Sequence, residues 1–337
     1  MTHMADVHIT LAHGNGGHYM RQLIEEIFTA PLANAVLDAN VDAVRLPRLQ
    51  GELMMTVDGF TVQPLIFPGG DIGSLAIHGT VNDLAVSGAI PRYLSLSAII
   101  EEGLALATLE QIIQSMAHAA RAANVMITCG DTKVVPRGEG SGVYFTTTGI
   151  GERYNDISLG LNKIENGDCI LVSGSVGDHG TAIMLAREQF GLSGEIESDN
   201  ASVAELCQAV YDIPGLRFMR DPTRGGLATV LHEIYRATGL GVLAQETHIP
   251  IKDPVRSVCD ILGYDPLYLA CEGRVLAVVA QEDAQHVLSA WQGLANGADA
   301  QIIGVLNKDI KRVVLETELG GQRVLEELED DPLPRIC

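Results

Sequence analysis

The 337-residue sequence lacks several features that assign a chain quickly to a class of protein. No stretch approaches the roughly 18 uninterrupted apolar residues of a membrane-spanning helix. The first residues lack a basic segment followed by an apolar core, so we expect no signal peptide. The six cysteines include no C-x-x-C pair, which argues against a zinc site or a disulfide framework. The sequence therefore predicts a cytoplasmic protein.

Two common phosphate-binding signatures are missing as well. There is no Gly-x-x-x-x-Gly-Lys-Ser/Thr segment, so the chain is not a P-loop protein, and the protein-kinase signatures are absent.

Positive charge is scarce, because 22 Lys and Arg residues against 43 Asp and Glu residues give a formal net charge of −21. Such a charge repels nucleic acid and anionic membranes. An anionic substrate must therefore be held by local donors and metal ions.

Length and composition predict two ordered domains. Apolar residues make up 47% of the chain and charged residues 19%, the balance of a folded globular protein. Expected helices and strands are mixed in both halves, which indicates α/β and α+β architecture. We predict a flexible N-terminus over 1–16, an N-terminal domain over 17–155, a C-terminal α+β domain over 165–315 and a mobile tail over 316–337.

The end of the chain carries an acidic run, two prolines one residue apart and a final cysteine, Cys337. Acidic neighbours repel one another and each proline removes a backbone N–H donor, so an extended, mobile tail is expected. Twelve extended residues reach up to about 40 Å, so the thiol could enter a site elsewhere on the protein or on a partner. The alternative is a frayed terminus whose last residue happens to be cysteine.

Four aspartates stand beside glycines or at expected strand and helix ends: Asp58, Asp83, Asp131 and Asp221. Residues 53–57 predict a buried strand that ends at Asp58, and a strand over 125–129 ends just before Gly130 and Asp131. Several hard oxygen ligands without a His/Cys cluster suit Mg²⁺ bridging to nucleotide phosphates. Each aspartate taken singly could instead cap a turn or a helix.

Further candidates surround these acids. Gly14-Asn15-Gly16-Gly17 predicts a flexible loop whose backbone could approach a phosphate, although any surface loop can be rich in glycine. A helix over 72–87 would carry Asn82 and Asp83 towards the core, where polar groups are costly unless bonded or metal-bound. Lys133 could supply positive charge near a phosphoryl group, or be an ordinary exposed lysine. Glu272 could be a general base, or lie in a surface turn.

Together these residues resemble the ATP-binding superfamily of aminoimidazole ribonucleotide synthetase, selenophosphate synthetase and thiamine-monophosphate kinase. The closing Pro334-Arg335-Ile336-Cys337 narrows the resemblance to the HypE family of NiFe-hydrogenase maturation factors. One departure is Cys271 before Glu272, where the family leads us to expect asparagine. The resemblance rests on the segments Thr56-Val57-Asp58-Gly59-Phe60, His78-Gly79-Thr80-Val81-Asn82-Asp83 and on to Pro91, Gly130-Asp131-Thr132-Lys133, and Asp221-Pro222-Thr223-Arg224-Gly225-Gly226.

The resemblance implies a two-domain, aminoimidazole ribonucleotide synthetase-like fold with a flexible C-terminal tail. Its N-terminal part would dimerise through its sheet, and ATP would bind between the two parts. Glu272 would abstract a proton, Lys133 would stabilise transition-state charge, and Cys337 would carry the substrate. Magnesium would be held by Asp58, Asp83, Asp131 and Asp221. The implied nucleotide-binding residues are Gly14, Asn15, Gly16, Gly17, Asn82, Asp83, Asp131, Thr132 and Asp221.

The implied reaction is the ATP-dependent dehydration of an S-carbamoyl group on Cys337 to a thiocyanate. A carbamoyltransferase, HypF, would load the tail, and a HypC–HypD complex would accept the cyanide for the hydrogenase iron. Two alternatives stay open. The chain could phosphorylate a free small molecule, with the tail serving as a docking peptide, or it could be a nucleotide-regulated scaffold without turnover.

Overall fold

The computed structural model describes residues 7–155, 157–187 and 195–328, and these divide into two compact units. The first unit holds residues up to Leu84 together with Pro91–Glu152, and the second holds Ala85–Ile90 and the residues from Arg153 on. Among the helices of the described ranges, none is both long enough and apolar enough to cross a membrane. The mixture of helix and sheet in both units confirms the predicted fold class.

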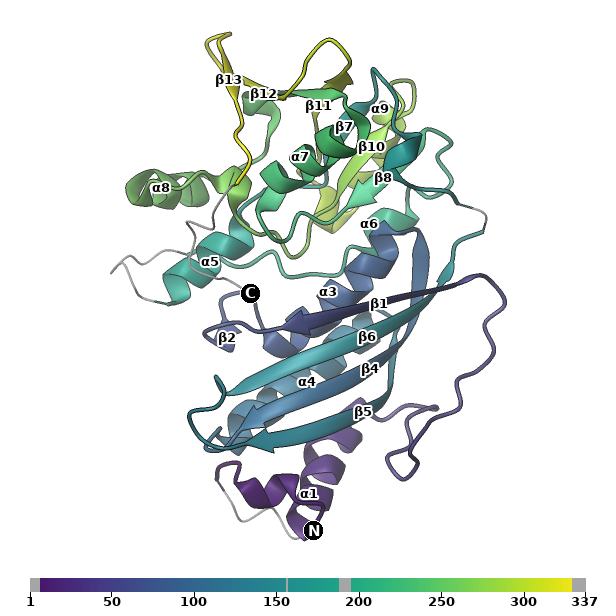
Figure 1. Cartoon of the computed structure of the whole chain (residues 1–337), viewed down its shortest axis with the longest axis vertical. Helices are drawn as coiled ribbons and strands as arrows, with labels where there is room; N and C mark the ends of the chain where they lie inside the picture. The colour runs from purple at the N-terminus through teal and green to yellow at the C-terminus, as the bar shows by residue number, and fades with distance from the viewer. Residues whose placement is uncertain (1–6, 156, 188–194, 329–337) are drawn as a thin grey trace. The chain divides into compact units, whose positions relative to one another are not determined.

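The first unit is built on a four-stranded sheet whose order is β1-β6-β4-β5 (Figure 1). Strand β1 runs antiparallel to β6, and β4 runs parallel to β5. Helices α3 and α4 cover one face, where the hydroxyl of Thr147 on β6 donates to the carbonyl of Ala76 on α3. The elements are η1 (Leu11–Gly14), α1 (His18–Leu23), η2 (Ile24–Thr29), α2 (Ala30–Leu32), β1 (Leu53–Phe60), β2 (Ile66–Phe67), β3 (Gly70–Asp71), α3 (Ile72–Val86), β4 (Ala89–Glu101), α4 (Leu106–Ala122), β5 (Met126–Val135) and β6 (Val143–Arg153).

Strand β1 differs from the buried strand predicted over 53–57. Its residues alternate between the helix-covered face and an open face, and Leu53, Met55 and Val57 on the open face are 65%, 72% and 61% exposed. Strands β1 and β5 also continue through Asp58 and Asp131, so neither aspartate lies at a strand end. Short apolar runs do not reveal strand length, because the backbone ladder to the neighbouring strand decides where pairing stops.

The N-terminal residues from 7 on are packed, which corrects the flexible segment predicted over 1–16. The N–H of Ile9 donates to Leu104 O at 2.8 Å, and Ile9 itself accepts a bond from Gly103 at 2.8 Å. The side chain of Ile9 is buried. The backbone of residues 7 and 9 therefore pairs with residues about a hundred positions later in the chain, which local sequence cannot show.

The second unit is built on a seven-stranded sheet of order β13-β12-β9-β11-β7-β10-β8 (Figure 1). Helix α7 lays Leu227, Leu231 and Ile234 into the core of this unit, as expected from an apolar stripe at helical spacing. The elements are η3 (Leu161–Lys163), β7 (Cys169–Val172), α5 (Asp178–Ala186), α6 (Ala204–Gln208), β8 (Leu216–Arg220), α7 (Gly226–Thr238), β9 (Gly241–Gln245), η4 (Glu246–His248), α8 (Asp253–Leu262), η5 (Pro266–Tyr268), β10 (Leu276–Val279), α9 (Ala284–Gln292), η6 (Ala295–Gly297), β11 (Gln301–Asn307), β12 (Val313–Glu316) and β13 (Gln322–Val324).

The ordered part of the second unit extends past residue 315, where the mobile tail was predicted to begin. Strand β13 pairs with β12, and Leu325 is 1% exposed within the core. The carbonyl of Leu325 lies 3.0 Å from His232 Nε2, and the next carbonyl, of Glu326, accepts a bond from the Tyr268 hydroxyl at 2.6 Å. These contacts could not be predicted from the acidic composition of the segment, because they are made by one buried leucine and two backbone carbonyls. Cys337 lies outside the described residues.

Candidate functional site

Two of the predicted metal-binding acids lie together on the helix-covered face of the first unit. Asp83 stands on α3, and its Oδ2 accepts a hydrogen bond from Thr56 Oγ1 on β1 at 2.8 Å. Asp58 is two residues after Thr56 and shares its face. A Cβ added at Gly79, one helical turn before Asp83, would lie 3.8 Å from Asp58 Oδ2. Strand β1 and helix α3 therefore bring these two carboxylates to one place, with the buried Asn82 beside them in the chain.

Asp131 and Lys133 occupy the opposite, open face of the same sheet. Asp131 pairs with Ser97 in register, whereas the next pair, Thr132 with Ala98, is buried under the helices. Lys133 Nζ lies 3.0 Å from Asp131 Oδ2, with both side chains more than half exposed. Exposed ion pairs contribute little to stability, so the fold does not depend on this pair. The sequence analysis assigned Asp131, Thr132 and Lys133 to one site with Asp58 and Asp83. It did not take into account that successive strand residues point to opposite faces of the sheet.

The glycine loop predicted to bind phosphate packs beside β5. A Cβ at Gly14 would lie 2.9 Å from the Cβ of Val134, so this glycine permits a close approach of the loop to the strand. Gly16 adopts a φ of +76°, which favours glycine, and Asn15 and Gly17 are exposed. The loop is thus ordered at Gly14 and open to solvent over the next three residues.

Asp221 and Glu272 belong to adjacent loops of the second unit. The N–H of Cys271 donates to Pro222 O at 3.0 Å, which ties the two loops together. Gly226, at the start of α7, has a φ of +60°, and a Cβ there would lie 2.5 Å from Leu269 O. Only glycine allows the helix to begin so close to the segment that leads to Glu272. Both acids are largely buried, at 8% and 6% exposure, so Glu272 is not in a surface turn.

Cys271, the departure from the expected family pattern, has a structural place. Its thiol is fully buried, accepts a bond from the Gly177 N–H at 3.3 Å and lies 3.8 Å from Leu269 O. Burial raises the pKa of this thiol well above its usual value, so it stays protonated and unreactive. The sulfur therefore serves as a hydrogen-bonding group inside the loop.

The four predicted metal ligands do not form one cluster in the described part of a single chain. No group of three or more His, Cys, Asp or Glu side chains suited to a metal is present within residues 7–155, 157–187 and 195–328. Asp58 and Asp83 are brought together, Asp131 lies on the other face of their sheet, and Asp221 belongs to the second unit. Thr132, also predicted to bind nucleotide, is buried on the helix-covered face.

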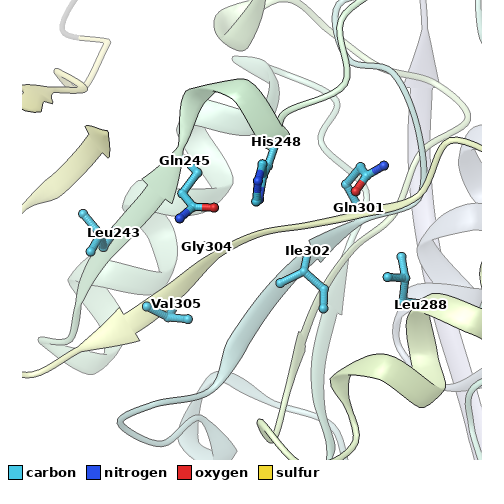
Figure 2. A pocket seen from close by; sticks show the side chains of 8 residues that line it. All are labelled: Leu243, Gln245, His248, Leu288, Gln301, Ile302, Gly304 and Val305. Atoms are coloured by element: carbon cyan, nitrogen blue, oxygen red, sulfur yellow. The ribbon is translucent and has the colours of Figure 1, made fainter. Parts of the chain in front are cut away.

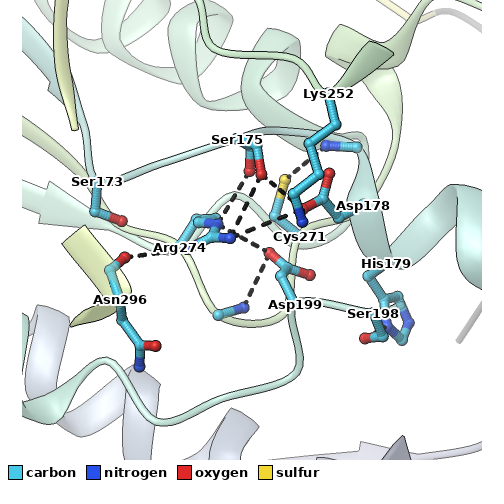
Figure 3. Close-up of polar contacts among 12 residues, drawn as sticks. Ser173, Ser175, Asp178, His179, Ser198, Asp199, Lys252, Cys271, Arg274 and Asn296 are labelled. Carbon is cyan, nitrogen blue, oxygen red and sulfur yellow. Dashed lines mark hydrogen bonds and ion pairs between the residues drawn. The ribbon is translucent and has the colours of Figure 1, made fainter. Parts of the chain in front are cut away.

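Sequence reasoning missed a buried polar cluster around Glu272, which includes Asp178, Asp199 and Arg274 (Figure 3). Asp199 is 73 residues before Glu272, and nothing in its local sequence distinguishes it. The only available signal was the position of Arg274, two residues after the proposed base. This cluster lies wholly within the second unit.

An open groove of about 400 Å³ lies elsewhere in the second unit, over β9 and β11 (Figure 2). Leu243, Ile302 and Val305 give it an apolar floor, and His248 stands at its side. None of the predicted site residues lines it.

Comparisons with known proteins agree with this architecture. The family model for the N-terminal domain of AIR synthase related proteins matches residues 37–152, and the model for the C-terminal domain matches residues 165–315. The chain is therefore an AIR synthase related protein with both domains of that fold.

Closer relatives narrow the family. The chain is 45% identical to carbamoyl dehydratase HypE of Azotobacter vinelandii over 331 residues, which cover 98% of this chain and 97% of that protein. A crystal structure of hydrogenase maturation protein HypE in complex with ATP has a TM-score of 0.92 and 43% identity, covering 97% of this chain and 99% of that one. The structure of a HypE–HypF complex matches with a TM-score of 0.80 and 42% identity, covering 90% and 99%. The chain belongs to the HypE family.

Proposed function

We propose that this chain is an ATP-dependent carbamoyl dehydratase that converts an S-carbamoyl group on Cys337 into a thiocyanate, the source of the cyanide ligand of the NiFe-hydrogenase iron. The observation that carries the proposal is the full-length identity of 45% with a carbamoyl dehydratase HypE, together with the terminal cysteine. Nine residues follow the last described one, so Cys337 can lie up to about 30 Å from residue 328.

The residues of the first unit fit ATP with Mg²⁺. Magnesium is usually held by one or two carboxylates, with phosphate and water oxygens completing an octahedron. Asp58 and Asp83 supply such a pair of hard oxygen donors, and Thr56 orients the second of them at 2.8 Å. When bound, the ion would neutralise phosphate charge. We assign Asp58 and Asp83 as its principal ligands and give Asn82 and the glycine loop to the nucleotide.

The chemistry requires a proton acceptor, and the second unit offers Glu272. In the proposed reaction the carbamoyl oxygen attacks the γ-phosphate of ATP, ADP leaves, and the oxygen becomes part of a good leaving group. A base then takes the remaining N–H protons in turn as inorganic phosphate departs and the C≡N bond forms. Glu272 suits this role because it is largely buried and its backbone is fixed beside Asp221. Cys337 provides the sulfur that holds the reacting carbon.

We further propose that two copies of the chain associate through the open face of the four-stranded sheet. This face carries exposed Met55 and Val57 on β1 and exposed Ile99 on β4, and Ile99 pairs in register with Lys133 on β5. Exposed apolar residues gathered on one side of a sheet favour burial against a partner. Asp131 and Lys133 would then act at the dimer, where Lys133 can stabilise phosphoryl charge, rather than beside Asp58 of their own chain.

The dimer is tested by the Met55→Asp variant, with Leu319→Asp as the control because Leu319 is 97% exposed on the second unit. Light scattering after size-exclusion chromatography should show a monomer for Met55→Asp and a dimer for the control. A dimer for both variants would contradict the assignment of this face.

The proposed partners rest on the same family membership. We propose that a HypF-type carbamoyltransferase loads Cys337, in line with the HypE–HypF complex, and that a HypC–HypD complex accepts the cyanide. A cytoplasmic location is consistent with the cysteines, since all five within the described residues are free thiols.

Mass spectrometry of the intact chain separates this function from its alternatives. After incubation with HypF, the carbamoyl donor and ATP, the wild-type tail should gain a carbamoyl group and then lose one water. ADP formation without a tail adduct would favour phosphorylation of a free small molecule, and neither product would favour a scaffold. Cys337→Ala should abolish the adduct, and one alanine appended after Cys337 should slow dehydration about a hundredfold, because reacting atoms tolerate little displacement. A cyanated adduct on another cysteine of Cys337→Ala would refute the assignment of Cys337.

A further inference from the structure

One buried carboxylate, that of Asp199 (Figure 3), accepts a hydrogen bond from the backbone of the proposed base. The side chain of Asp199 is fully buried. Its Oδ1 accepts the N–H of Glu272 at 3.0 Å, and its Oδ2 accepts the N–H of Gly273 at 3.3 Å. Each carboxylate oxygen thus serves one of two successive N–H groups, which fixes the orientation of the peptide plane between them.

Arg274 holds this carboxylate in place. Its Nε lies 3.5 Å from Asp199 Oδ2 and also donates to Ser175 O at 3.0 Å, while Nη1 donates to Asn296 O at 3.1 Å. The guanidinium side chain is only 14% exposed. A buried carboxylate requires a charged partner and several hydrogen bonds; the arginine supplies the charge, and the N–H groups of Glu272 and Gly273 supply the hydrogen bonds. Burial still raises the pKa of Asp199 above its usual value, against the opposing effect of Arg274.

The remaining sides of the Glu272 backbone are also held. The carbonyl of Glu272 accepts the N–H of Ala201 at 3.4 Å. A Cβ added at Gly273 would lie 1.9 Å from the carbonyl oxygen of Asp199, so the two chain segments can approach this closely only because residue 273 is glycine. The backbone that carries the Glu272 side chain is therefore clamped to the 199–201 segment at three points.

We propose that Asp199 is a positioning residue for the dehydration step, which orients Glu272 through its backbone and does not touch the substrate. This inference rests on the proposed function, because it assigns Asp199 a task only if Glu272 is the base. The physical reason is that a base must meet its proton within hydrogen-bonding distance, and a shift of about 1 Å can cost on the order of a hundredfold in rate.

The Asp199→Asn variant tests this with a small change of shape. An asparagine has one acceptor oxygen and one NH₂ group, so it can accept only one of the two N–H groups and directs a donor at the other. We expect the Glu272 backbone to shift, with dehydration slowed by about 10–100-fold. Binding of ATP and carbamoylation of Cys337 should stay at wild-type levels, since neither step uses the base.

Asp168→Asn provides a matched control. Asp168 is another buried acid of the second unit, accepts the N–H of Glu165 at 2.7 Å and lies 3.7 Å from Arg217 Nε. It immediately precedes β7 at the end that pairs with Val279, whereas Glu272 precedes the opposite end of β10. Its replacement removes a comparable buried charge without changing the bonds to Glu272 and Gly273.

The measurement is a single-turnover one on full-length protein. Each variant is carbamoylated by HypF, freed of donor and mixed with ATP and Mg²⁺, and the loss of water is followed by mass spectrometry over a series of ATP concentrations. We expect Asp199→Asn to lower the limiting rate with an unchanged half-saturating ATP concentration, and Asp168→Asn to match wild type. A wild-type limiting rate in Asp199→Asn, or an equal loss in both variants, would overturn the proposal. Failure of wild-type protein to form thiocyanate would instead refute the proposed function.

Amide hydrogen exchange in the wild-type protein keeps the proposal testable if Asp199→Asn does not fold. The N–H groups of Glu272 and Gly273 should exchange slowly, because both donate to a buried carboxylate. Exchange at the rate of an unstructured peptide at these two positions would show that the clamp does not exist in solution.

Discussion

The packing of Leu325 predicts that the residues around 325 stabilise the second unit. Leu325 is 1% exposed and lies in the core cluster, where replacement of a buried leucine by alanine costs about 2–5 kcal/mol. Leu319 lies in the same region but is 97% exposed, so Leu319→Ala should change the free energy of unfolding by less than about 0.5 kcal/mol. The two variants remove the same atoms and differ only in burial.

Urea denaturation followed by tryptophan fluorescence measures this difference. Trp291 is the only tryptophan, is fully buried and belongs to the second unit, so its signal reports that unit. Leu325→Ala should lower the urea midpoint without a change in slope, whereas Leu319→Ala and a chain ending at residue 328 should keep the wild-type midpoint. Equal midpoints for Leu325→Ala and Leu319→Ala would refute the packing of Leu325. A large loss on removal of residues 329–337 would refute the view that these contribute little to stability.

Three further outcomes are expected. Asp83→Asn should raise the Mg²⁺ concentration needed for half-maximal ATP binding by about tenfold or more, and an unchanged titration would remove Asp83 from the metal site. Glu272→Gln should bind ATP and accept the carbamoyl group but dehydrate it about 10²–10⁴-fold more slowly, so wild-type rates would exclude Glu272 as the base. Burial lowers the pKa of His179 to about 3. As the pH falls below about 6.5, this histidine binds a proton in the unfolded chain but not in the folded chain, so the folded state loses stability. His179→Gln should lessen that loss by up to about 1.4 kcal/mol per pH unit in urea titrations between pH 6.5 and 4, and an unchanged slope would show that His179 is not buried in its neutral form.

The sequence by itself determined the long helices. The helix expected over 72–87 is α3 (Ile72–Val86), a long apolar run that is buried nearly all round. Leu109, Ile112, Ile113 and Met116 likewise form an apolar stripe at helical spacing, and all four are buried on α4 (Leu106–Ala122). The motif segments around Asp83 and Asp221, with the terminal cysteine, were sufficient to indicate the family that the comparisons then showed.

Only the tertiary structure decided which face each strand residue occupies. Asp58 and Asp131 were expected alike at strand ends, yet β1 and β5 run through both and turn them to opposite faces of one sheet. A single-residue change of register exchanges the two faces, and register depends on the partner strand rather than on local composition. The sequence therefore could name these carboxylates but could not say which of them meet.

Long-range packing decided the rest. Asp199 reaches Glu272 across 73 residues, and Leu325 reaches the core from a segment whose composition is that of a tail. In both places the partner of the distant side chain includes backbone N–H or carbonyl groups, which nearly all residue types possess and which leave no trace in a sequence pattern. The candidate base was readable from the chain, whereas the buried acid that holds it became visible only when the two loops were brought together.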